Sequence, residues 1–123
     1  MILEIDHVQL AMPPGGEDVA REFYQDVLGL DEIKKPPQLA LRGGCWFQGA
    51  VSVHLGVEAD FRPALKAHPA FVVDDLANCA RMLIAAGFTV NWDKSNLTVK
   101  RFFSADPFGN RLEFLDLHGS TAS

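Results

Sequence analysis

Three histidines and one glutamate have side chains and spacing that could support metal chemistry. His7 and His68 lie 61 positions apart, and His54 and Glu113 lie 59 positions apart. Imidazole nitrogen and carboxylate oxygen suit a divalent ion such as Zn²⁺, Ni²⁺, Fe²⁺, Mn²⁺ or Co²⁺. A single histidine on a strand is more often a surface or hydrogen-bonded core residue than a ligand. The matched spacing adds a second interpretation, in which all four residues share one metal site.

The elements that would position these residues form two similar series. In the first half, alternating or helical hydrophobic spacing predicts a strand over 2–12, a helix over 17–28, extended pieces at 31–35 and 39–43, and a strand over 51–57. In the second half it predicts a strand over 68–73, a helix that begins after Asp74 or Asp75, and strands at 89–92, 99–105 and 111–117. Each half therefore reads as βαβββ, with one candidate ligand on its first strand and one on its last.

The alternation of side chains predicts which sheet face carries the candidates. His54 alternates with Val53 and Leu55, and the first and last strands of the chain show the same pattern. His68 is less clear, because Val72 shares its parity. A sheet covered by its helix on one side buries the apolar face there. The imidazoles and the carboxylate are then expected on the opposite face.

Composition and charge exclude several classes of protein. The chain has 123 residues, a net charge of −5 and a pI near 5.2, which argues against a nucleic-acid or acidic-membrane binder. It contains no apolar run of the roughly 20 residues that span a bilayer, and no secretory signal is evident. Cys45 and Cys79 lack CxxC spacing and are expected to be reduced thiols. We expect a soluble cytoplasmic protein with one domain over 1–123.

Within that domain the sequence predicts two modules joined by a short linker. The first module covers about 2–58, the linker about 59–66, and the second module about 67–117. A polar tail follows over 118–123. The linker is short and of ordinary composition, so the modules are expected to pack together.

Four segments carry a resemblance to a known family: DHVQLAMP, AREFYQDVLGL, HPAFVVDDLANCARMLIAAG and FFSADPFGNRLEFLD. Over about residues 3–117 the chain resembles the vicinal oxygen chelate superfamily, which includes glyoxalases, bleomycin-resistance proteins and extradiol dioxygenases. The resemblance implies an α+β fold, in which two tandem βαβββ modules form curved mixed sheets around a metal-binding cleft. Family ligands lie on the first and last strands of each module. These positions map to His7, His54, His68 and Glu113.

The resemblance also implies an activity. Such proteins bind a substrate through adjacent oxygens to a metal that acts as a Lewis acid. The expected function is a metal-dependent glyoxalase-like lyase or isomerase acting on a small oxygenated metabolite. Glu113 and His54 are the expected catalytic groups, with His54 either a fourth ligand or a nearby base. Glyoxalase I-like members have glutamates at both closing positions, whereas this chain has His54 at the first, which separates it from them.

Alternative functions remain open at this point. His7, His68 and Glu113 would also satisfy the trio of a small extradiol-type dioxygenase or a thiol transferase. A non-catalytic protein of the bleomycin-resistance type would instead sequester a drug or metabolite. In either case Trp46, Phe47 and Trp92 could line an apolar cleft or pack in the core, and Lys100 and Arg101 could meet an anionic group or lie on the surface. The resemblance implies a homodimer, with each site formed within one chain or across two.

Overall fold

The computed structural model describes residues 1–95 and 98–116. The chain forms two compact units, Met1–Pro63 and Ala64–Ser123, and each is described by itself. The boundary after Pro63 falls inside the segment that the sequence marks as a linker. The predicted polar tail, 118–123, lies outside the described residues.

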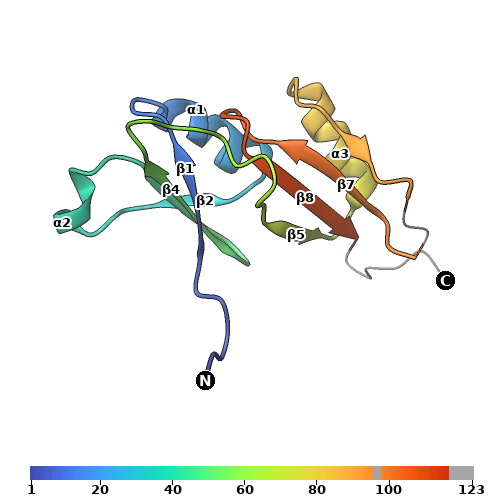
Figure 1. The fold of residues 1–123 in the computed structure, drawn as a ribbon, viewed down its shortest axis with the longest axis horizontal. Coiled ribbons are helices and arrows are strands. Elements are labelled where there is room, and N and C mark those ends of the chain that lie inside the picture. The colour runs from blue at the N-terminus through green and yellow to red at the C-terminus, as the bar shows by residue number, and fades with distance from the viewer. Residues whose placement is uncertain (96–97, 117–123) are drawn as a thin grey trace. The chain divides into compact units, whose positions relative to one another are not determined.

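The first unit is built on a four-stranded mixed sheet (Figure 1). Its elements are β1 (Val8–Met12), α1 (Glu17–Arg21), η1 (Glu22–Val27), β2 (Asp31–Ile33), α2 (Pro37–Ala40), β3 (Cys45–Gln48) and β4 (Ser52–Val57). The strand order is β1-β4-β3-β2. The first strand pairs in parallel with the last, and the other pairs are antiparallel.

The second unit repeats this plan. Its elements are β5 (Ala70–Val73), α3 (Leu76–Ala85), β6 (Asn91–Trp92), β7 (Arg101–Ala105) and β8 (Arg111–Asp116). The order is β5-β8-β7-β6, with β5 parallel to β8. The two mixed sheets confirm the predicted α+β fold of tandem βαβββ modules.

One face of each sheet forms a hydrophobic core with the helices. In the first unit the buried residues include Met12, Phe23, Tyr24, Phe47, Val53 and Leu55, and in the second they include Leu76, Leu83, Phe102, Leu112 and Phe114. The predicted alternation is therefore correct, since Val53 and Leu55 are buried in the core. Phe47 is a core residue and not part of an exposed cleft.

The helices are short and differ in how they begin and continue. Asp75 caps α3, because its carboxylate accepts a hydrogen bond from the Asn78 backbone N–H at 3.0 Å. The helix predicted over 17–28 changes at Glu22 to the wider turns of η1, a π-helix. Within the described ranges, no helix is both long enough and apolar enough to cross a membrane.

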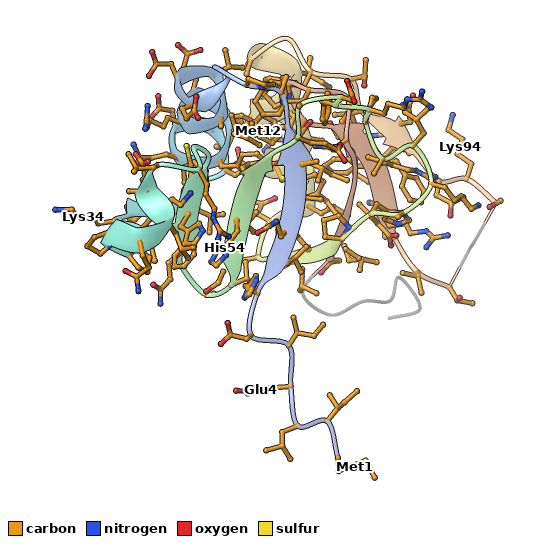
Figure 2. The ribbon with its side chains drawn as sticks, turned by 60° about the vertical axis from the view of Figure 1, so that its left-hand side comes forward. Met1, Glu4, Met12, Lys34, His54 and Lys94 are labelled. Atoms are coloured by element: carbon orange, nitrogen blue, oxygen red, sulfur yellow. The ribbon has the colours of Figure 1, made fainter. Side chains whose placement is uncertain are left out.

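Two of the predicted strands differ from the structure: one is shorter than predicted, and the other is not a strand. The first begins only at Val8, and the residues before it form an exposed extended arm that carries Met1 and Glu4 (Figure 2). The extended piece predicted at 39–43 is instead the end of α2 and a turn. Pro37 favours the first helical turn, which alternation alone does not reveal.

Candidate functional site

Two of the predicted ligands meet at the start of β1. His7 directly precedes this strand, and the parallel register places Gln9 opposite His54 on β4. The His7 and His54 rings are stacked, with centroids 4.1 Å apart and planes inclined by 16°. His54 is only 8% exposed, and Figure 2 shows its position on β4. The first unit therefore brings these two histidines into direct contact.

The indole ring of Trp46 also stacks on the His54 imidazole. Trp46 is its register partner on β3, and their ring centroids lie 4.0 Å apart with planes inclined by 6°. Burial lowers the pKa of His54, and the nearby His7 adds to this, so the neutral imidazole is favoured. Lone pairs lie in the plane of their ring. Those of His7 and His54 therefore lie in two stacked planes inclined by 16°.

Asp6 orients the imidazole of His7. Its Oδ2 lies 2.9 Å from His7 Nδ1. An ionised carboxylate only accepts, so Nδ1 carries the proton and donates it. In the neutral ring the lone pair is then on Nε2. A carboxylate behind a metal-binding imidazole fixes the tautomer in this way.

The other two predicted ligands meet in the second unit. His68 Nε2 lies 2.9 Å from Glu113 Oε1, and His68 Nδ1 lies 2.8 Å from the carbonyl oxygen of Lys66. Both partner oxygens act as acceptors when Glu113 is ionised, so this arrangement requires a proton on each ring nitrogen. The Lys66 carbonyl fixes the proton on Nδ1. The contact between Nε2 and Oε1 holds the exchangeable proton.

Glu113 also has a cationic neighbour on β7. Its carboxylate is only 6% exposed, and Oε2 accepts a hydrogen bond from Arg101 Nη1 at 3.2 Å. Arg101 Nε also donates to Asp93 at 2.8 Å. Hydrogen bonds from Ser95 and then from Arg101 lower the pKa of Asp93 to about 2. Arg101 thus braces two carboxylates and keeps Glu113 aimed at His68.

The donor chemistry of these residues fits a divalent cation. A cation that replaces the shared proton would find Nε2 of His68 and Oε1 of Glu113 side by side, with the imidazole oriented by a backbone carbonyl. His7 has the same arrangement of an anchored Nδ1 and an available Nε2. Across the ranges 1–95 and 98–116, no three His, Cys, Asp or Glu side chains are gathered as a ready-made metal site.

Sequence reasoning found the two pairs but missed their supports. The missed residues are Asp6, Lys66, Arg101 in its bracing role, and Trp46 as a stacking partner. The pair Asp6-His7 is visible in the sequence and could have been noticed, because a carboxylate next to a predicted ligand is a common orienting partner. The cross-strand partners depend on register, which side-chain alternation does not give.

Comparison with solved structures relates the chain to known proteins. A crystal structure of a Bacillus anthracis protein assigned to the glyoxalase family is 48% identical, with 94% of this chain and 96% of that chain covered and a TM-score of 0.89. No family model and no curated protein matches the chain.

More distant structures share the fold. A variant of the fosfomycin resistance protein FosX from Listeria monocytogenes, solved with Mn(II) and dihydroxypropylphosphonic acid, is 14% identical over 94% of this chain and 93% of that chain, with a TM-score of 0.78. Lactoylglutathione lyase from Agrobacterium tumefaciens is 19% identical over 89% and 91% of the two chains, with a TM-score of 0.66. The chain belongs to the glyoxalase family, within the vicinal oxygen chelate superfamily.

Proposed function

We propose that this protein is a metal-dependent glyoxalase-like enzyme, a lyase or isomerase that acts on a small oxygenated metabolite. His7, His68 and Glu113 are the proposed ligands of a divalent metal. The observation that carries the proposal is the pair formed by His68 and Glu113. A buried carboxylate faces an imidazole nitrogen whose partner nitrogen is already anchored to a carbonyl.

Each proposed ligand has a support that limits its movement. The Lys66 carbonyl holds the His68 ring by Nδ1, and Asp6 holds His7 in the same way. Arg101 occupies Oε2 of Glu113 and leaves Oε1 as the working oxygen. A bound divalent ion would supply Lewis-acid stabilisation of negative charge that develops on substrate oxygen.

Proton movement falls to Glu113 in this proposal. Its Oε1 lies 2.9 Å from His68 Nε2, and in the absence of a bond to the ion this oxygen could accept a proton from a substrate and return it. His54 is stacked and neutral and supports the His7 ring. Only one closing position carries a carboxylate, so we propose single-carboxylate chemistry and not the two-glutamate reaction of glyoxalase I.

Metal titration tests the ligand set. Protein freed of metal with a chelator is titrated with Zn²⁺, Ni²⁺, Mn²⁺ and Co²⁺ by calorimetry, in two buffers that differ in ionisation enthalpy. We expect one ion per chain, and a binding heat that differs between the two buffers would show that the ion displaces a proton from its ligands. His68→Gln and Glu113→Gln should each weaken binding by about tenfold to a hundredfold or more.

The control is Glu58→Gln, which removes the same charge from an exposed position in the first unit and should bind metal like the wild type. Equal binding by the wild type and Glu113→Gln would overturn the ligand assignment. A wild type that binds no divalent ion but binds a cationic glycopeptide drug would instead support the sequestration function.

A further inference from the structure

Arg111, at the start of β8, is a cation close in the sequence to the proposed ligand Glu113, and within residues 1–95 and 98–116 it has no ionic partner. Its side chain is half-buried, and its Cζ lies 4.1 Å from the centroid of the Phe103 ring. No carboxylate among the described residues comes within ion-pair distance of it. The guanidinium therefore keeps planar donors that suit a carboxylate, phosphate or phosphonate.

The strand register places Arg111 next to the His68–Glu113 pair. Glu113 is two residues along the same strand, about 7 Å away on the same sheet face. Ala70, the first residue of β5, pairs with Glu113, and His68, two residues earlier, reaches Glu113 Oε1 at 2.9 Å. The hydrogen bond from the Glu113 N–H to the Pro69 carbonyl, at 3.1 Å, supports this alignment.

Phe103 holds Arg111 in place. The antiparallel register pairs Phe103 with Glu113 and Ala105 with Arg111, so the ring lies diagonally across from the guanidinium. The Arg111 backbone N–H also donates to the Ala64 carbonyl at 2.8 Å, which fixes the start of the strand. A guanidinium lying over an aromatic ring is pre-organised, and this lowers the entropy lost when it binds a ligand.

The other charged groups on this face already have partners. Glu113 is bound by His68 and Arg101, and Asp93 is also bound by Arg101. Arg101 therefore already forms ion pairs with two carboxylates, those of Asp93 and Glu113. Among the described residues of this face, Arg111 is the cation that has no carboxylate partner.

We propose that Arg111 binds an oxyanion group of the substrate, a carboxylate, phosphate or phosphonate, while the reacting oxygens lie at His68 and Glu113. The second part of this statement rests on the proposed function. The anion site itself belongs to the second unit and needs no metal. It narrows the substrate class to small anionic metabolites.

The test uses the metal-free protein, so that an added anion cannot bind to a metal ion. Methylphosphonate and acetate are titrated separately and followed by ¹H–¹⁵N NMR, including the arginine Nε–H signals. We expect the NMR signal of Arg111 Nε–H to shift when at least one of the two anions is added. The anion that binds with the lower dissociation constant then indicates whether the site prefers a phosphonate or phosphate group or a carboxylate group. Arg111→Met should weaken binding by about tenfold or more, since hydrogen bonds to charged groups are among the stronger ones.

Two variants make the result specific. Arg81→Met removes the same charge from an exposed position on α3 in the same unit and should leave anion binding within about twofold of wild type. Arg111→Lys keeps the charge without the planar fork and should fall between the wild type and Arg111→Met. Arg111→Met should also bind a divalent metal at least as tightly as the wild type, because a neighbouring positive charge has been removed.

Equal losses in Arg81→Met and Arg111→Met, or an unchanged Arg111→Met, would overturn the anion site. If the wild type binds anions but no metal, the proposed metal function fails while the anion site stands. If it binds metal but neither probe, the anion proposal fails alone.

Discussion

The stacked position of His54 is the residue-scale feature that most alters its expected role. The resemblance implies a metal ligand at His54, and its ring stacks on both Trp46 and His7 and is nearly buried. A neutral imidazole in this position can hold the His7 ring by stacking on it. We propose that His54 positions the His7 imidazole in this way, and its role as a fourth ligand or a base stays a prediction.

Replacing His54 with Phe should keep the stack and remove a titrating group. Burial lowers the His54 pKa below the ordinary 6.5, so its contribution to stability is complete above that pH and is lost as the pH falls through the folded-state pKa. In urea denaturation of metal-free protein, the free energy of unfolding should therefore drop more between pH 7 and pH 5 for wild type than for His54→Phe. His54→Ala should lose about 2 kcal/mol at pH 7 through loss of the ring. Equal pH dependence of wild type and His54→Phe would contradict this account.

The two cysteines should be unreactive in the folded protein. Burial raises the pKa of Cys45 and that of Cys79 each to about 11. Only the thiolate reacts, so alkylation by iodoacetamide at pH 8 should be about 100-fold slower than for a free cysteine. Mass spectrometry should detect rapid double labelling in urea and almost none in buffer. Fast labelling of Cys45 in buffer would indicate that β3 opens readily.

The sequence predicts the candidate residues themselves but not the residues that contact them. Alternation assigned His54 and Glu113 to the polar face, because a period of two is a local property of the chain. The contacts of Arg101 and Arg111 with Phe103 depend on how β7 and β8 align, which is set by the turn between them. The sequence of either strand alone therefore does not predict these cross-strand contacts.

Among the elements, the βαβββ order was predictable and the irregular connections were not. The turn before β3 is an example, since Gly43 and Gly44 both have positive φ, at 76° and 85°. Hydrophobic spacing does not reveal such a turn. The sequence therefore predicts an extended piece at 39–43, whereas β3 begins at Cys45. Similarly, the change from α1 to η1 leaves the apolar pattern almost unaltered.

Gly44 should be nearly intolerant of a side chain. A Cβ there would lie 2.1 Å from the Leu55 carbonyl oxygen, and the backbone has positive φ. Gly15 also has positive φ, at 81°, but a Cβ there would meet no heavy atom within 4 Å. We expect Gly15→Ala to cost about 1–2 kcal/mol and Gly44→Ala at least about 3 kcal/mol in urea denaturation. Similar losses in the two variants would mean that β3 can shift away from Leu55 at little cost.

At the scale of the whole molecule, each unit contains one tryptophan and part of the proposed ligand set. Trp46 belongs to the first unit with His7, and Trp92 belongs to the second with His68 and Glu113. Each tryptophan therefore reports the unfolding of one unit. If the proposed ligands His7, His68 and Glu113 bind the same ion, that ion stabilises both units.

Single-tryptophan variants test this prediction. Trp92→Phe leaves Trp46 as the fluorescent reporter, and Trp46→Phe leaves Trp92. Metal at 100 times its dissociation constant should add about 2.7 kcal/mol to the stability of any unit that unfolds with loss of the ion. Thermal unfolding followed by fluorescence should shift upward in both variants, and Glu113→Gln should abolish both shifts. A shift reported by Trp92 alone would assign the metal to the second unit without His7.

The parallel pairing of the first and last strands has a consequence for biosynthesis. In the second unit β8 lies between β5 and β7, so a strand synthesised after both of its neighbours occupies the interior of the sheet. Until it emerges, β5 and β7 expose backbone groups that only β8 can pair, as open sheet edges do. A nascent or truncated chain would thus present two open edges to chaperones and to other chains. The same late strand carries Glu113 and Arg111, so the proposed metal and anion sites form only after β8 has paired.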